Sequence, residues 1–266
     1  DEVICDRQSH IYNYEGGGIA FNSGCSVRLL HGERGLFTAE DVAQNINNPE
    51  DVHLPLTRLV SVENTCNRGG GSIYDFEELK KIGEVCRKYG LKYHIDGARL
   101  FNAIVETPQT PRDYGKIFDT ISICLSKGLG CPVGSLLIGN KQDIKKARRV
   151  RKVFGGGMRQ AGYLAAAGIY ALDHHIDRLK EDHRKAREIA KVLENLPFVK
   201  TVLPVETNIV VFDLKDGIER DEFLKKLKQK NILAIAFGPQ RVRMVTHLDI
   251  KDEMLEKLFQ ILQKIV

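Results

Sequence analysis

The segments Tyr93-His94-Ile95-Asp96-Gly97-Ala98-Arg99 and Ile121-Ser122-Ile123-Cys124-Leu125-Ser126-Lys127-Gly128 decide the fold prediction for this chain. Each predicts a strand that ends at a charged side chain followed by glycine. The second segment is rich in apolar residues, which is typical of a strand whose sheet is covered on both faces. We therefore expect Asp96 and Lys127 at the carboxyl ends of two successive strands, where open α/β sheets bind their ligands.

The residues around these two segments indicate further elements of the same sheet. Strands are predicted at 59–62, 91–96, 120–126 and 134–138. A helix is predicted before the second of them, with Asp75 and Glu78 as its capping box and Gly90 at its end. Strands that alternate with helices indicate an α/β fold, in which helices cover both faces of a mainly parallel sheet.

The chain changes character after Gly155-Gly156-Gly157. A long helical stretch is predicted over residues 160–195, with an interruption near 173–177. Beyond it, strands are predicted at 208–214, 232–237 and 241–246, and helices at 221–230 and 252–266. We therefore expect a large domain over residues 1–165, followed over residues 166–266 by a linking helix and a small C-terminal α+β domain.

The composition excludes several classes of protein. Of the 266 residues, 42% are hydrophobic and 28% are charged, which is typical of a soluble globular protein and not of a disordered one. The six cysteines include no CxxC pair, so we expect neither a disulfide framework nor a zinc site, and a cytoplasmic location. No apolar run reaches membrane length and no signal peptide opens the sequence, so we expect no membrane association.

One basic run, Lys145–Lys152, stands out in a chain whose formal net charge is only +5. Such a run could contact phosphate or nucleic acid, or it could be the solvated face of a helix. No aromatic residue lies within the run to stack on bases. We favour the solvated helix face and expect no nucleic-acid partner.

Asp96 and Lys127 together predict a site for pyridoxal 5'-phosphate. A lysine amine captures the aldehyde of this cofactor, and its ring nitrogen acts as an electron sink only while a carboxylate keeps it protonated. Taken alone, Asp96 could instead cap the next helix and pair with Arg99 at the surface. Lys127 at the end of the next strand favours the cofactor, and Arg99 then suits bidentate binding of an amino-acid carboxylate.

His10 is a further candidate near the start of the chain, within a segment that is predicted to be a strand. A lone histidine usually lies at the surface or is a satisfied core residue. The functional alternative is an imidazole that stacks on the pyridine ring. The residues around His10 do not select between these two roles.

Six segments of the chain resemble the low-specificity L-threonine aldolases, which are pyridoxal-phosphate enzymes of fold type I. The resemblance runs from Asp6 to His247, and the segments are specific only in combination. They are Ser9–Ile11, Leu59–Thr65, His94–Ala103, Leu125–Leu129, Gly155–Gly162 and Val242–His247. The resemblance implies the aspartate-aminotransferase-like fold, with a mainly parallel sheet between helices and a small C-terminal α+β domain.

The resemblance also implies a role for each central residue. Lys127 would form the Schiff base with the cofactor and Asp96 would pair with the ring nitrogen. His10 would stack on the ring. Arg99 and Arg243 would hold the substrate carboxylate, with Arg99 also close to the cofactor.

Three more residues match the family. His53 matches a second family histidine near the substrate hydroxyl, although Leu-Pro-Leu-Thr follows it where Phe-Pro-Arg-Thr or a similar sequence is usual. Lys152 and Arg159 match basic residues that reach the cofactor phosphate of a neighbouring subunit. An ordinary basic helix face stays open as the alternative for these two.

The implied activity is that of an aldehyde-lyase, the retro-aldol cleavage of L-threonine, L-allo-threonine and related β-hydroxy-α-amino acids through a cofactor imine. The products would be glycine and an aldehyde, with His53 or a water held by the histidines as the base. The alternative enzyme is another of fold type I, either an aminotransferase or a β-eliminating lyase. A non-catalytic assembly subunit or an inactive truncated fragment is the alternative outside enzymes.

The relatives also carry an upstream section with a Ser-Gly-Thr-type loop, whose backbone amides bind the cofactor phosphate. We therefore expect the large domain to be N-terminally incomplete, and this chain alone to bind the cofactor weakly or not at all. Visible absorbance of normal strength from the bound cofactor would refute this. Phosphate contacts across subunits imply a homo-oligomer, a dimer or tetramer with shared active sites.

Overall fold

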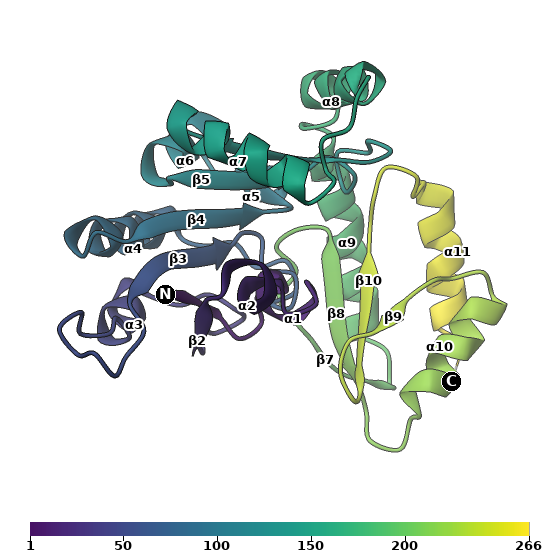
Figure 1. Cartoon of the computed structure of the whole chain (residues 1–266). Coiled ribbons are helices and arrows are strands. Elements are labelled where there is room, and N and C mark those ends of the chain that lie inside the picture. Colours follow the sequence, from purple (N-terminus) through teal and green to yellow (C-terminus); the bar gives the residue numbers. More distant parts are fainter. Residues whose placement is uncertain (266) are drawn as a thin grey trace.

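The structure, a computed structural model, describes residues 1–265 and contains two β-sheets (Figure 1). The first sheet has the strand order β2-β1-β3-β4-β5-β6, and the second has the order β7-β8-β10-β9. The strands are β1 (Glu2–Asp6), β2 (Ser26–Leu30), β3 (Thr57–Glu63), β4 (Lys92–Gly97), β5 (Thr120–Cys124), β6 (Ser135–Gly139), β7 (Val199–Val202), β8 (Ile209–Leu214), β9 (Ile235–Ala236) and β10 (Arg241–Val245). The helices are α1 (His10–Asn13), α2 (Gly18–Ser23), α3 (Ala39–Gln44), α4 (Phe76–Lys88), α5 (Leu100–Ile104), α6 (Pro111–Ile117), α7 (Lys141–Val153), α8 (Gly162–His174), α9 (Leu179–Glu194), α10 (Arg220–Gln229) and α11 (Asp252–Leu262).

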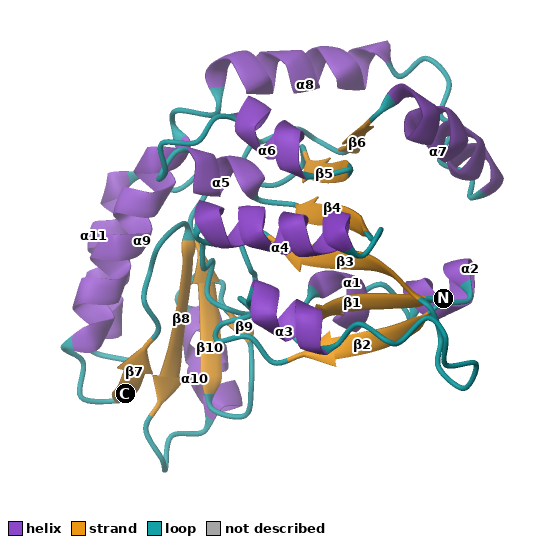
Figure 2. Ribbon diagram, turned by 90° about the vertical axis from the view of Figure 1, so that its left-hand side faces the viewer, coloured by secondary structure: helices purple, strands orange, loops and turns teal. Residues whose placement is uncertain are grey.

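The first sheet is parallel except at β6, which pairs antiparallel with β5. Helices lie on both sides of it, with α3 and α4 on one side and α1 and α2 on the other (Figure 2). Tyr93 and Ile95 of β4 are buried in the same core cluster as Leu79 and Ile82 of α4. The α/β fold with a mainly parallel sheet, predicted from the sequence, is therefore confirmed.

The second sheet is antiparallel and has its own hydrophobic core. Phe212 of β8, Val242 of β10 and Leu258 of α11 belong to this core. Helix α9 joins the two cores, because its first residue Leu179 belongs to the first core and Leu193 belongs to the second. The domain boundary after residue 165 stays a prediction.

Three local expectations were wrong. The segment around His10 was expected to be a strand, but His10 begins helix α1, since β1 ends where the Asp6 carboxylate accepts the N–H groups of Gln8 and Gly32, both at 2.7 Å. The strand expected at 232–237 is reduced to β9, an edge strand that pairs with β10 at only two positions. The third error concerns the capping box before α4.

Asp75 does cap α4, but its side chain accepts the N–H of Glu77, at 2.7 Å. The Glu78 carboxylate does not complete a capping box. It accepts the N–H of Ala39, which starts α3, at 2.8 Å. Glu78 therefore links α4 to the neighbouring helix α3 and does not cap its own helix.

Among the described residues, no helix is both long enough and apolar enough to cross a membrane.

Candidate active site

Asp96 lies near the end of β4, where it pairs with Glu63 of β3 on one side and Ser122 of β5 on the other. Residues paired across a sheet point to the same face, so these three side chains share one face of the sheet. The Asp96 side chain is largely buried, and its Oδ1 atom accepts the N–H of Ala98 at 3.1 Å. A buried carboxylate thus ends the central strand, as predicted.

Lys127 follows β5, the next strand of the sheet, and is partly buried. Its Nζ atom donates to the Cys124 Sγ atom at 3.3 Å, and no carboxylate within residues 1–265 forms an ion pair with it. Lys127 and Arg99 line one cavity of about 390 Å³. That volume is within the range of small-molecule sites.

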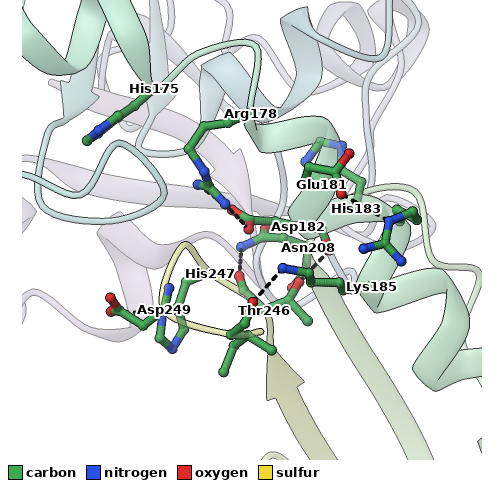
Figure 3. A network of polar contacts seen from close by, with 12 residues as sticks. His175, Arg178, Glu181, Asp182, His183, Lys185, Asn208, Thr246, His247 and Asp249 are labelled. Carbon is green, nitrogen blue, oxygen red and sulfur yellow. Dashed lines mark hydrogen bonds and ion pairs between the residues drawn. The ribbon is translucent and has the colours of Figure 1, made fainter. Parts of the chain in front are cut away.

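The opposite wall of this cavity comes from the second sheet, with Asn208 before β8 and His247 after β10. Figure 3 shows how this wall is fixed to helix α9. The Thr246 hydroxyl donates to the Asp182 carbonyl at 2.6 Å, and the Asn208 amide donates to the Thr246 carbonyl at 2.9 Å. Arg178 in turn donates to the Asp182 carboxylate at 3.0 Å. Elements of both sheets therefore line the cavity.

Arg99 and Arg243 approach the site from different sheets. Burial lowers the pKa of Arg99, and the carboxylates of Glu63 and Asp96 oppose this effect. Burial lowers the pKa of Arg243 to about 10, and the nearby positive charge of Arg99 adds to the effect. The Arg243 Nε atom is buried and has no hydrogen-bond partner in the described chain. Two adjacent guanidiniums, one with an unpaired buried donor, fit an anionic ligand such as a carboxylate.

His10 reaches the site through its place at the start of α1. Its backbone N–H donates to the Glu63 Oε2 atom at 2.6 Å, and its ring lies 5.1 Å from that of Tyr14. The His10 Nδ1 atom is 3.1 Å from the Glu15 carboxylate. Glu63, whose paired residue in the sheet is Asp96, therefore fixes the helix that carries His10.

The structure does not bring the other three candidates into this cluster. His53 lies in an exposed turn, where its N–H donates to Asp51 at 2.9 Å. Lys152 is exposed near the end of α7, and Arg159 is exposed in the loop that follows it. Within one chain, these residues stand apart from Asp96 and Lys127.

Glu63 and Arg68 belong to the site region and were not singled out from the sequence. Glu63 lies inside the segment Leu59–Thr65, and its position directly after a predicted strand was the available signal. Arg68 offered no signal, because its partners are Tyr14 and Phe237, far away in the sequence.

Burial raises the pKa of the Glu63 carboxyl to about 7, and the nearby Asp96 charge adds to this effect, while the N–H groups of Asn67 and His10 oppose it. A raised pKa means that the native state binds this proton more tightly than the unfolded state. Protonation of Glu63 therefore stabilises the folded state fully below about pH 4.5, and this stabilisation is lost as the pH rises through about 7.

We predict that Glu63→Gln removes this pH dependence, which amounts to roughly 3 kcal/mol between pH 4.5 and 8 at about 1.4 kcal/mol per unit of pKa. Denaturant unfolding of both proteins across that range measures it. Glu84→Gln, on an exposed face of α4, is the control and should keep the wild-type slope. An unchanged slope in Glu63→Gln contradicts the prediction.

The side chains around the cavity fit pyridoxal phosphate. Lys127 offers an amine without a competing carboxylate, and Asp96 offers a buried carboxylate at the end of the adjacent strand. The cavity that Lys127 lines together with Arg99 is large enough for a small molecule. Among the described residues, no group of three His, Cys, Asp or Glu side chains is arranged to hold a metal ion.

Comparison with known proteins identifies the family of the chain. Residues 1–216 match the Beta-eliminating lyase family. The chain is 39% identical to the probable low-specificity L-threonine aldolase 2 of Arabidopsis thaliana, over 99% of this chain and 76% of that protein. It is 40% identical to the low specificity L-threonine aldolase of Escherichia coli K12, over 97% of this chain and 75% of that protein.

Among solved structures, the threonine aldolase of Leishmania major superposes with a TM-score of 0.82 at 21% identity, covering 100% of this chain and 78% of that one. This likeness establishes the fold, which is that of the fold type I pyridoxal-phosphate enzymes. The sequence relatives add the family. The chain belongs to the threonine aldolases of the beta-eliminating lyase family.

Proposed function

We propose that this protein is a pyridoxal-phosphate-dependent aldehyde-lyase that cleaves L-threonine and related β-hydroxy-α-amino acids to glycine and an aldehyde. The observation that carries the proposal is the pair formed by Asp96 and Lys127 at adjacent strand ends, next to a cavity that Arg99 also lines. The threonine aldolase relatives support the same activity.

Each residue of the cluster has a role in this reaction. Lys127 would hold the cofactor through its aldehyde, and Asp96 would keep the ring nitrogen protonated. The cofactor would supply an electron-accepting ring for the cleavage. Arg99 and Arg243 would hold the substrate carboxylate and so orient the substrate for cleavage of its Cα–Cβ bond.

The substrate hydroxyl must lose its proton while the Cα–Cβ bond breaks. We assign to His10 the stacking on the ring and the orientation of a water that accepts this proton. Its backbone contact with Glu63 and its packing beside Tyr14 support this assignment. His53 is the second candidate for the base. Its exposed turn lies outside the cluster, so this role requires that His53 reach the site by a loop movement or from a neighbouring subunit.

A direct test compares two reactions in the cofactor-loaded full-length protein. We expect threonine to release acetaldehyde and glycine, and alanine with a keto acid to give no amino transfer. Amino transfer without aldehyde release would indicate an aminotransferase and would overturn the proposal.

We infer that the protein forms a homo-oligomer through the surface around α8. This helix is apolar along most of its length, yet only Gly168 and Ala171 are buried. Tyr163 is 91% exposed and Ile169 is 63% exposed. A helix that is apolar on all sides is normally covered. A second copy on this surface would bring Lys152 and Arg159 of one chain towards the cofactor phosphate of the other.

We predict that Tyr163→Lys combined with Ile169→Lys dissociates the oligomer, because two charges would have to be buried in an apolar interface. Sedimentation velocity measures the change, and the affinity for the cofactor should fall with it. Tyr89→Lys, at the exposed end of α4, is the control and should leave the assembly unchanged. An unaltered sedimentation coefficient in the double variant contradicts this interface.

We also infer that the protein works in the cytoplasm. All six cysteines are free, which suits a reducing compartment.

A further inference from the structure

Three arginines, rather than two, gather at one side of the candidate active site. Arg68 and Arg243 both lie against the ring of Phe237, with guanidinium carbons 4.5 Å and 5.2 Å from its centroid. Arg68 and Arg99 are both close enough to Arg243 for their charges to lower its pKa. Like charges repel at this range, so the cluster is costly unless an anion offsets it.

The chain itself supplies little of that negative charge. Among residues 1–265, none of the three arginines forms an ion pair with an aspartate or glutamate. Glu63, whose charge acts on Arg99, already accepts the N–H groups of His10 and Asn67, at 2.6 Å and 2.8 Å. The carboxylate of a threonine substrate would engage Arg99 and Arg243. Arg68 is then left without a negatively charged partner.

Arg68 is linked to His10 through Tyr14. Its Nη1 atom donates to the Tyr14 hydroxyl at 2.6 Å, and the Tyr14 ring packs beside His10. In the proposed reaction, His10 orients the water that accepts the hydroxyl proton. Tyr14 thus links Arg68 to the residue assigned to the substrate hydroxyl, whereas Arg99 and Arg243 are assigned to the α-carboxylate.

We propose that Arg68 is a specificity-determining residue, which binds a second carboxylate on the β-carbon and makes β-hydroxy dicarboxylic amino acids, such as 3-hydroxyaspartate, preferred substrates. This inference rests on the proposed function. Arginine suits the role, because its planar guanidinium binds a carboxylate through two parallel hydrogen bonds.

The reaction would be the same as with threonine. The Cα–Cβ bond of 3-hydroxyaspartate breaks, its electron pair remains with Cα, the hydroxyl loses its proton and Cα gains one. The products are glycine and glyoxylate, and together they contain every atom of the substrate. No oxidant or reductant is needed.

The test measures kcat/KM for 3-hydroxyaspartate and for threonine in the cofactor-loaded full-length protein. We expect the wild type to prefer 3-hydroxyaspartate by about tenfold to a hundredfold, the usual effect of one charge-assisted pair. Arg68→Gln should remove this preference through KM and leave threonine cleavage within about twofold. Arg68→Lys keeps the charge and should retain part of the preference. The control Arg58→Gln, in an exposed position on β3, should change neither value.

Calorimetric binding of L-aspartate and L-alanine separates this inference from the proposed function, because neither ligand carries a hydroxyl. Tighter binding of aspartate that Arg68→Gln abolishes supports the role of Arg68 even if neither substrate is cleaved. Equal affinities in the wild type overturn it. A second result would also overturn the role of Arg68 in substrate choice. If Arg68→Gln weakens cofactor binding and lowers kcat/KM for both substrates equally, Arg68 binds the cofactor and not the second carboxylate.

Discussion

Replacing Lys127 by alanine is expected to abolish threonine cleavage in the cofactor-loaded full-length protein. Lys127 follows the strand next to that of Asp96 and lines the cavity with Arg99. Without its amine, the cofactor has no covalent attachment and the substrate amine has nothing to displace. We expect kcat to fall below detection, and the visible absorption band of the lysine-bound cofactor to disappear. Acetaldehyde release and absorption spectroscopy measure the two effects.

Two further variants make the Lys127 test specific. Lys127→Arg keeps a positive charge but cannot bond covalently to an aldehyde, so it should be as inactive as Lys127→Ala. Lys88→Ala, at the exposed end of α4, should behave as the wild type. Near-normal turnover in either Lys127 variant would remove this lysine from the catalytic role.

Replacing Asp96 by alanine is expected to lower kcat by roughly three orders of magnitude, which corresponds to about 4 kcal/mol of activation barrier. Asp96 is buried at the end of β4, so no solvent can replace its carboxylate as the partner of the ring nitrogen. A cofactor ring whose nitrogen is unprotonated accepts electrons poorly. Loss of the Asp96 carboxylate therefore affects bond cleavage more than substrate binding. We expect a large fall in kcat with a smaller change in KM.

Asp96→Asn separates charge from shape, because the amide fills the same space without the negative charge. It should lose nearly as much activity as Asp96→Ala. Asp216 lies in an exposed loop, so Asp216→Asn is the control and should leave kcat and KM unchanged. Activity within tenfold of the wild type in both Asp96 variants would contradict the assignment.

The central part of the site could be predicted because it depends on local pattern. Strands 91–96 and 120–126 were predicted from their residues, and they correspond to β4 and β5. Parallel neighbouring strands end at the same edge of a sheet, so the adjacency of the strand ends that precede Gly97 and Lys127 followed from the sequence. Strands 208–214 and 241–246 were likewise predicted, and they correspond to β8 and β10.

The rest depends on contacts between segments distant in sequence, which no local pattern reveals. Helix α1 starts at His10 because Asp6 and Glu63 accept backbone N–H groups there. Arg68 is oriented by Tyr14 and Phe237, which come from α1 and the loop after β9. For His53, the sequence match gave a role but not a location, and the turn that contains it is exposed.

The most direct test of the central claim reduces the cofactor-loaded protein with borohydride, which fixes any bond between the cofactor and a lysine amine. Mass spectrometry of the resulting peptides then locates the modified residue. The account predicts one pyridoxyl group per chain, attached to Lys127. A group on a different lysine, or no attached group in protein that has bound the cofactor, would contradict it.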